Sequence, residues 1–361
     1  MRLYKMELYK LCHKKIFLIG LAAIAALMFL FFWFVEVGDE LAVVDGKTYS
    51  GYEAVQMNRK ITKEFAGTIT DEKIDQIVGK YGISSKLIEN MPGWRDGNYL
   101  SDFITRYFTD GSMEQGVLPT ERYSLEESEL GDVCERLQVT PALEYTKGWK
   151  IFIEMLGLGF MMGSVLVICS VSRVFAGEET TKMLPLIFTT EEGRRKDIAA
   201  KIAASITLTI IIFAAILLFN TLLCGVVFGF DGFDNLSGIV LLSYFSMVNQ
   251  QPFLNYVTMV ILFGMQGLLS LCAVTLCISA QCKSSFSAVI AAAICWCVPL
   301  LVRMIFRGLL SIVILATPIF LTMNGMIEDI YPFWRIAAVI SMFIGVGCMV
   351  GGYKKYQTKN A

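Results

Sequence analysis

The sequence contains little of what soluble enzymes and secreted scaffolds depend on. It holds one histidine, His13, among 361 residues, so a zinc site would lack its commonest ligand. The net charge of −1 and the absence of a long basic stripe exclude a field that would attract nucleic acid. Cys134 is the only cysteine between residues 37 and 148, so this region cannot form an internal disulfide.

A nucleotide-binding motif is also missing. The only Gly-Lys-Thr tripeptide occupies residues 46–48, and Leu41 stands where the first glycine of a Walker A motif is required. The acidic pair at 191–192 is typical of some intramembrane metalloproteases, but the shortage of histidine argues against that chemistry. We therefore expect no enzymatic activity, no metal site and no cofactor bound by this chain itself.

Apolar residues, in contrast, are abundant. They make up 55% of the chain, and the mean hydropathy is +0.59, above the apolar share of about 45–50% in ordinary globular domains. Charge-free runs alternate with charged stretches, and a helix that is apolar all round is stable only among lipids or other helices. The sequence therefore predicts an all-α polytopic protein of the cell membrane.

The first apolar run gives the orientation. Residues 16–35 carry no charge over about 30 Å of helix, which matches one bilayer core. Basic residues precede this run and Glu36, Asp39 and Glu40 follow it, so the positive-inside rule places the N-terminus in the cytosol. The apolar core exceeds the usual 7–15 residues of a signal peptide and no small-residue cleavage site follows, so we expect a retained anchor.

The next region has the composition of a soluble domain. Acidic residues outnumber basic ones between residues 37 and 148, and the stretch is too long for a linker. Thr70 before Asp71 and Glu72 indicates a helix start. Ser124 and Glu127 form a capping-box pattern ahead of apolar residues 130, 133, 134 and 137, which indicates an amphipathic helix. We expect an extracytoplasmic, α-rich domain between the first two spans.

Six spans fit the remaining pattern best. Lysines 354, 355 and 359 follow the last apolar run, so an even number of spans places both termini in the cytosol. Residues 308–326 contain Pro318 and would give a seventh span if they crossed, which would place these lysines outside. The short run 236–248 would give an eighth.

The predicted layout is as follows: cytosolic basic elbow 1–15, span one 16–36, extracytoplasmic domain 37–148, span two 149–172, cytosolic coupling loop 173–201, span three 202–230, external loop or re-entrant element 231–255, span four 256–281, span five 286–306, external re-entrant element 308–327, span six 333–353 and cytosolic tail 354–361.

The loop between spans two and three carries the most information. Phe175 is followed by Glu178 and Glu179, then by an apolar stretch that contains Leu184 and Pro185, and basic residues close the loop. This order resembles the loop of type-2 exporter permeases of the ABC transporter superfamily, and the basic elbow and six spans resemble that family in layout. The sequence departs from the family at Thr180, where a glycine is usual, and in its large domain after span one.

The resemblance implies a permease subunit of an ATP-driven exporter for an amphiphilic substrate, such as an antimicrobial peptide or lipid-like compound. A separate ATPase subunit would bind and hydrolyse Mg-ATP, and the chain would form a homodimer or a heterodimer with a homologous permease in the membrane lipid. The loop would dock on the ATPase and lever the spans. The implied coupling residues are Phe175, Glu178, Glu179, Thr181, Leu184, Pro185, Arg194 and Lys201.

The residues themselves agree with this reading, because an acidic pair and a basic cluster flank an apolar strip that a partner would cover. The alternative is a solvated connector whose basic residues only fix topology. In that case the protein would be a non-transporting membrane sensor or anchor that displays its extracytoplasmic domain. An ion-coupled transporter is disfavoured because the long runs are almost free of acidic residues.

Three charges lie within or at the ends of apolar runs: Glu154, Arg303 and Arg307. A charge at mid-bilayer costs roughly 2.5–3.5 kcal/mol on insertion scales, so each needs a wet or paired site. They are candidates for a substrate path or gate. The alternative is that they reach an interface by snorkelling.

Overall fold

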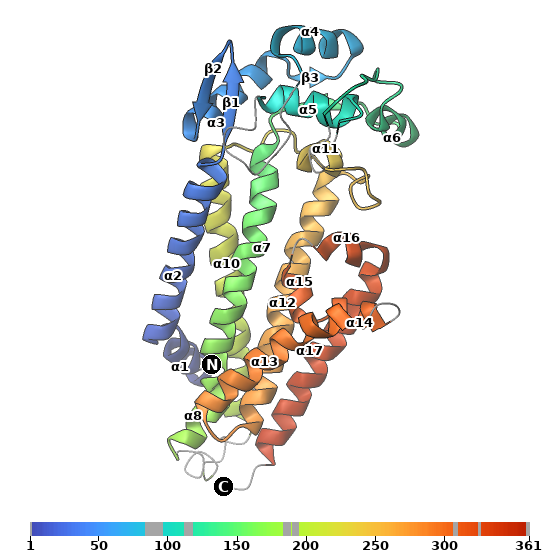
Figure 1. Cartoon of the computed structure of the whole chain (residues 1–361). Coiled ribbons are helices and arrows are strands. Elements are labelled where there is room, and N and C mark those ends of the chain that lie inside the picture. Colours follow the sequence, from blue (N-terminus) through green and yellow to red (C-terminus); the bar gives the residue numbers. More distant parts are fainter. Residues whose placement is uncertain are drawn as a thin grey trace. The chain divides into compact units, whose positions relative to one another are not determined.

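The computed structural model describes residues 2–83, 97–111, 118–182, 189, 195–305, 310–323 and 326–358, most of them in helices (Figure 1). Within these ranges, 6 helical segments are long and apolar enough to cross a membrane. They are Lys15–Val37, Lys147–Thr180, Lys196–Val227, Phe253–Gln281, Ser285–Ile305 and Ile327–Gln357. The chain therefore has the fold of a helical multi-pass membrane protein, and the prediction of six long apolar helices is confirmed.

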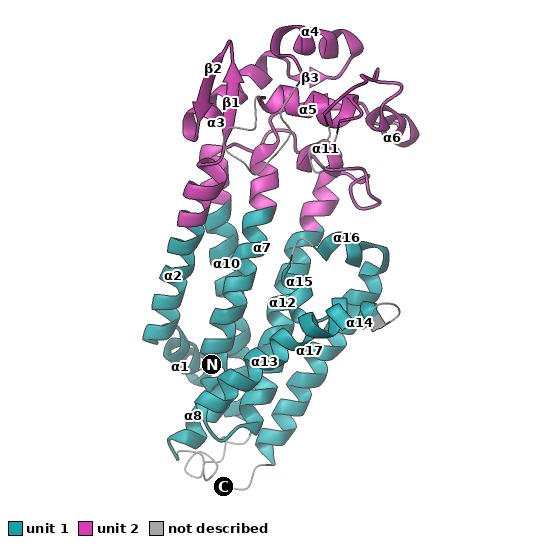
Figure 2. Ribbon diagram, in the orientation of Figure 1, with its two compact units in different colours: residues 1–28, 154–220, 259–361 teal, residues 29–153, 221–258 magenta. Residues whose placement is uncertain are grey.

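The chain divides into two compact units, coloured separately in Figure 2. Unit 1 comprises residues 1–28, 154–220 and 259–361, and unit 2 comprises residues 29–153 and 221–258.

The helices that lie wholly or mainly in unit 1 are α1 (Arg2–Cys12), α2 (Lys15–Phe31), α7 (Lys147–Val171), α8 (Arg173–Thr180), α10 (Lys196–Val227), α12 (Phe253–Gln281), α13 (Ser285–Ile305), α14 (Leu310–Leu315), α15 (Pro318–Thr322), α16 (Ile327–Ile330), the 3-10 turn η3 (Tyr331–Phe333) and α17 (Trp334–Gln357).

Small residues allow the apolar helices of unit 1 to approach closely. Gly159 and Gly163 lie one turn apart on α7, and a Cβ atom added at either would come within 2.7 Å of the Ile216 side chain of α10. Apolar helices gain little from hydrophobic exclusion inside lipid, so close packing at small residues is a main source of their association. These two glycines therefore set the α7–α10 distance.

The region 308–327 contains two short helices, α14 and α15, and no long one among its described residues. Pro318 opens α15 at a position where its missing N–H costs no hydrogen bond. Ile319, Phe320 and Leu321 are buried in an apolar cluster with residues of α14. Among its described residues, this region therefore has no helix long enough to form a seventh span.

Unit 2 contains the remaining elements: the π-helical turn η1 (Phe32–Val37), β1 (Leu41–Val44), β2 (Lys47–Ser50), α3 (Tyr52–Glu64), β3 (Gly67–Thr68), α4 (Asp71–Tyr81), α5 (Tyr99–Phe108), α6 (Glu129–Leu137), β4 (Ala142–Leu143) and α11 (Ser237–Leu241).

Two antiparallel strand pairs accompany these helices, β1 with β2 and β3 with β4. Strands β1 and β2 are joined by Asp45 and Gly46, with φ of 52° and 74°. Both residues have the left-handed backbone conformation that a type I′ turn requires, and Asp-Gly is a strong sequence signal for such a turn. The region predicted to be an α-rich domain therefore also contains a β-hairpin. The Asp-Gly dipeptide is a sequence signal for it, but the sequence analysis predicted only helices there.

The two predicted helix starts had different outcomes. Thr70 caps α4, and its hydroxyl accepts from the Lys73 N–H at 3.3 Å. Ser124 does not open α6, so that prediction is corrected. The Glu127 carboxylate accepts from the Ser124 N–H at 3.0 Å, but the pair closes a turn. The Ser128 hydroxyl instead accepts from Gly131 N–H at 3.0 Å and caps the helix.

The segment 231–255 belongs to unit 2, and its helices are the five-residue α11 and the first residues of α12, which begins at Phe253. Besides hydrogen bonds within itself, it is bonded to the region 37–148: the Tyr107 hydroxyl donates to Gly238 O at 2.7 Å, and Ala142 N donates to the Asn235 side chain at 3.2 Å. The predicted eighth span, residues 236–248, therefore contains only the short helix α11 and no helix long enough to cross a membrane.

Candidate functional site

The site is built around α8, the short helix that follows α7. The first N–H groups of a helix have no partner inside it. Here a side chain of α12 supplies one, because the Ser279 hydroxyl accepts from the N–H groups of Phe175 and Ala176, each at 3.1 Å. The same hydroxyl donates to Ser172 O at 2.7 Å. A single buried serine thus fixes the start of α8 against α12.

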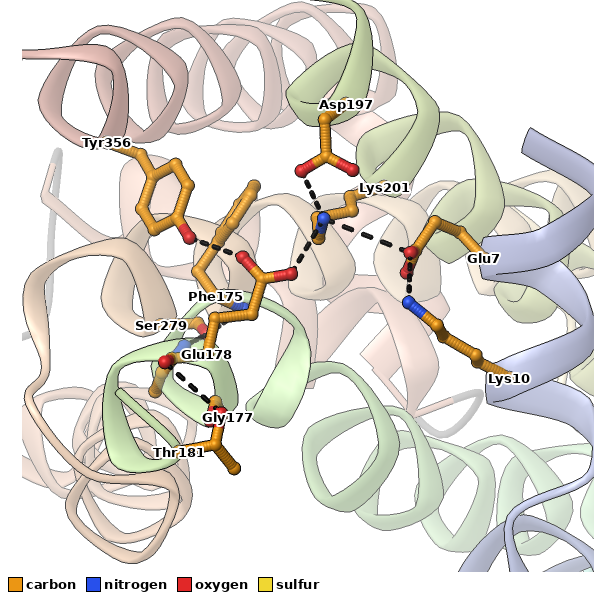
Figure 3. A network of polar contacts seen from close by, with 11 residues as sticks. Glu7, Lys10, Phe175, Gly177, Glu178, Thr181, Asp197, Lys201, Ser279 and Tyr356 are labelled. Atoms are coloured by element: carbon orange, nitrogen blue, oxygen red, sulfur yellow. Dashed lines mark hydrogen bonds and ion pairs between the residues drawn. The ribbon is translucent and has the colours of Figure 1, made fainter. Parts of the chain in front are cut away.

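Glu178, one turn further along α8, bonds to two other helices (Figure 3). One carboxylate oxygen accepts a hydrogen bond from the Tyr356 hydroxyl of α17 at 2.6 Å. The other lies 2.8 Å from Lys201 Nζ of α10. The Phe175 ring packs beside the Tyr356 ring with centroids 4.4 Å apart. Helix α8 is therefore held to α10 and α17 by both charge and packing.

Lys201 is the centre of the cluster. It is 2% exposed, and its ammonium group forms an ion pair with Asp197 on the preceding turn of α10. Glu7 of α1 lies 3.9 Å from it and also pairs with Lys10 at 2.6 Å. Side chains of α1, α8 and α10 thus surround one ammonium group, as Figure 3 shows.

The energetics make this junction sensitive to the loss of any partner. Removing charges from water costs several kcal/mol per ion, and their attraction offsets this only with good geometry and additional hydrogen bonds. The Lys10 and Tyr356 donors supply such bonds to two of the carboxylates. Deleting one partner would leave uncompensated buried charge, at a cost of about 3–5 kcal/mol.

The cluster connects several helices through its polar side chains. Its members are carboxylates, ammonium groups, a phenol and a serine hydroxyl that is occupied with backbone groups. The described residues contain no group of three or more side chains arranged to hold a metal ion. What the arrangement can do is transmit a displacement of α8 to α1, α10, α12 and α17.

The structure brings three predicted coupling residues together: Phe175, Glu178 and Lys201. Phe175 and Lys201 are buried, so any influence of a partner on them is indirect. Glu179 is half-buried. Thr181 is exposed and closes α8 by donating to Gly177 O at 3.0 Å. The other three predicted residues, Leu184, Pro185 and Arg194, lie outside the described residues.

The predicted path or gate residues do not join this cluster. Glu154 is exposed on α7. Arg303, near the end of α13, is half-buried, pairs with Asp329 of α16 at 3.0 Å and also bonds to the Ser311 hydroxyl. Arg307 lies outside the described residues. Arg303 thus ties three neighbouring elements of unit 1 together through a paired charge.

Five members of the cluster were not predicted as site residues: Glu7, Lys10, Asp197, Ser279 and Tyr356. Asp197 had a local signal, because a carboxylate four residues before a lysine on a helix is well placed to pair with it. Glu7 is the only acidic residue before the first span. Ser279 and Tyr356 lie about 100 and 180 residues from their partners, and no local pattern indicated them.

In comparisons with known proteins, no protein family, curated protein or solved structure matches the chain.

Proposed function

We propose that this chain is the permease subunit of an ATP-driven exporter of the ABC superfamily, and that α8 with the loop after it receives the movement of a separate ATPase subunit. The observation that supports this most is the junction at α8, where Glu178 contacts Lys201 and Tyr356. A loop that served only as a connector would not need buried contacts to several long apolar helices.

The proposed transmission follows the contacts in order. A partner that displaces the loop after Thr181 moves α8 with it. Glu178 then carries the displacement to α10 and α17, and Ser279 carries it to α12. Packed helices tend to have discrete alternative arrangements and do not deform continuously. A small shift at one end can therefore switch them from one arrangement to another.

The proposal includes an orientation. The junction end carries α1 with its basic residues and the end of α17 with Lys354 and Lys355, and basic residues next to apolar spans favour the cytosol. We therefore propose that both termini and α8 are cytosolic, and that residues 37–148 are extracytoplasmic. The substrate would be amphiphilic, and two permease chains would pair in the membrane.

The test is purification of the tagged full chain from cells that co-express the proteins encoded by its neighbouring genes, followed by reconstitution into nanodiscs and measurement of vanadate-sensitive ATP hydrolysis. We expect a subunit with a Walker A motif to co-purify. Glu178→Gln keeps the shape of the side chain but removes its charge, so we expect assembly to persist while substrate-stimulated hydrolysis falls about tenfold.

Two further variants sharpen the outcome. Leu184→Asp introduces a charge into the apolar part of the loop and should abolish co-purification while membrane insertion stays normal. Lys5→Gln removes an exposed charge of α1 and serves as the matched control, with no effect on either quantity. If Leu184→Asp keeps the ATPase and its stimulation, the loop is a connector and the sensor or anchor alternative replaces the transporter.

A further inference from the structure

A second feature of unit 1 is an open cavity of about 540 Å³ beside the charge cluster, between α1, α8 and α10. Part of its wall is apolar, from Leu3, Met6 and Leu11 of α1 and Val174 of α8. Helix α1 is amphipathic, and its apolar residue Met6 is 54% exposed. An apolar wall that is open to the surface is suited to a ligand with a hydrocarbon part.

The charges of the cavity do not balance. The carboxylates of Glu7, Glu178 and Asp197 are engaged by the ammonium groups of Lys10 and Lys201 and by the Tyr356 hydroxyl. Two more cations, Lys14 and Arg173, line the same cavity. Both are exposed, and neither forms an ion pair with any described carboxylate. Four cations therefore face three carboxylates in the cavity lining, which leaves one positive charge in excess.

Both cations also lie where apolar helices end. Lys14 directly precedes α2, and Arg173 opens α8 two residues after the end of α7. A residue at the end of a membrane-spanning helix lies at the level of the lipid headgroups. Desolvation and then repulsion from the charge of Arg173 lower the pKa of Lys14, and the Glu7 carboxylate offsets this in part. An anion between them would relieve this repulsion.

We propose that this cavity binds the phosphate headgroup of an anionic phospholipid, with Lys14 and Arg173 as its phosphate ligands and the apolar residues of α1 and α8 against the acyl chain. The lipid would fasten the amphipathic helix α1 to the start of α8. This site is separate from the exporter proposal, because it requires only that α2 and α7 span a membrane.

A soluble phosphate compound shares the headgroup chemistry, but the apolar wall and the position at the helix ends favour a lipid. An acyl chain gains about 0.8 kcal/mol for each CH₂ group it buries, whereas free phosphate gains only the charge contacts, which salt screens. The two sources therefore differ in what competes for the site.

The experiment uses the purified full chain in a neutral detergent. Native mass spectrometry counts retained lipid after addition of phosphatidylglycerol or of phosphatidylcholine, and thermal unfolding is followed under the same conditions. We expect one tightly retained phosphatidylglycerol per chain, a rise in the unfolding temperature with that lipid only, and no comparable rise with inorganic phosphate. Lys14→Gln/Arg173→Gln should weaken retention at least tenfold and abolish the rise.

The control is Lys5→Gln/Lys15→Gln, which removes the same amount of charge from exposed residues of α1 and α2 that do not line the cavity. It should keep the lipid. A charge-conserving variant, Lys14→Arg/Arg173→Lys, should keep most of the retention and shows that a loss in the first variant is not misfolding. Equal loss in the cavity variant and the control would mean general attraction of anionic lipid and would overturn the proposal. Equal stabilisation by inorganic phosphate would assign the cavity to a soluble anion and overturn it as well.

Discussion

The two units use the same pair of residue types in opposite ways. In unit 1, Lys201 pairs with Glu178 at 2.8 Å with side chains 2% and 16% exposed. In unit 2, Lys80 pairs with Glu64 at 2.7 Å with side chains 47% and 44% exposed. The distances are nearly equal, but the attraction between two charges rises several-fold as the surroundings become less polar. Enclosure, and not distance, therefore decides how much each pair matters.

Enclosure also changes what each pair connects. The Glu64 carboxylate and the Lys80 ammonium group join α3 and α4 at the surface, where a water molecule can replace either partner. Glu178 joins α8 to α10 and α17 in a place where its partners have no substitute. The comparison predicts a graded series of mutational effects, which measurements on the full chain in detergent can test.

The largest effect is expected for Lys201→Met. This change keeps the apolar stem but leaves Glu178, Asp197 and Glu7 without their shared cation, at a cost of about 3–5 kcal/mol. The unfolding temperature should fall sharply, and hydrogen exchange should increase first in α1 and α8. Lys5→Met, an exposed change on α1, is the control. A fall no larger than that of the control would show that the cluster is solvated and would remove the distinction between the two pairs.

A smaller loss is expected for Tyr356→Phe. The ring contact with Phe175 remains, but the charged hydrogen bond to Glu178 is lost, and such bonds contribute about 1.5–3 kcal/mol. Hydrogen exchange should increase in α8 and in the last turns of α17 while α1 keeps its protection. An increase spread evenly over all helices would indicate that Tyr356 acts through general packing alone.

Tyr107→Phe tests a buried polar contact in unit 2 that involves no full charge. The Tyr107 hydroxyl donates to Gly238 O at 2.7 Å, and burial raises the pKa of this phenol far above its usual range. Gly238 O keeps a backbone partner, Ser243 N at 3.0 Å, so the loss should be about 1 kcal/mol. Local exchange in residues 236–243 measures it, and an effect as large as that of Tyr356→Phe would contradict the ranking by charge.

The smallest effect is expected for Lys80→Gln. The hydrogen bond from Lys80 lowers the pKa of the Glu64 carboxyl, so its contribution is present above the unfolded-state pKa and is lost as pH falls through the folded-state pKa. Because both side chains are exposed to solvent, salt should screen the effect. The unfolding temperature at neutral pH should not change measurably. At roughly 1 M salt, charges are screened beyond about 3 Å. A clear fall in the unfolding temperature of Lys80→Gln that persists at this salt concentration would show that an exposed ion pair can matter as much as an enclosed one.

Much of the helical architecture was predictable from local pattern. Charge-free runs such as residues 202–227 admit few structures other than long helices among lipid or other helices, because unpaired backbone groups are too costly there. The Thr70 cap was likewise readable, since a threonine before two acidic residues satisfies N–H groups at a helix start. The capping pattern at Ser124 misled because Ser128, four residues later, offered the same chemistry nearer to the apolar face of α6.

The sequence by itself determined the class of the protein, a helical membrane protein, and the number of its long apolar helices. Apolar run length and the placement of charges are local properties, and lipid enforces their consequences. Only the tertiary structure decided that Lys201 is buried, that Glu7 and Tyr356 belong to its surroundings, and that Ser279 caps α8. These partners come from helices far apart in the chain, and their meeting depends on how the helices pack, which no single segment encodes.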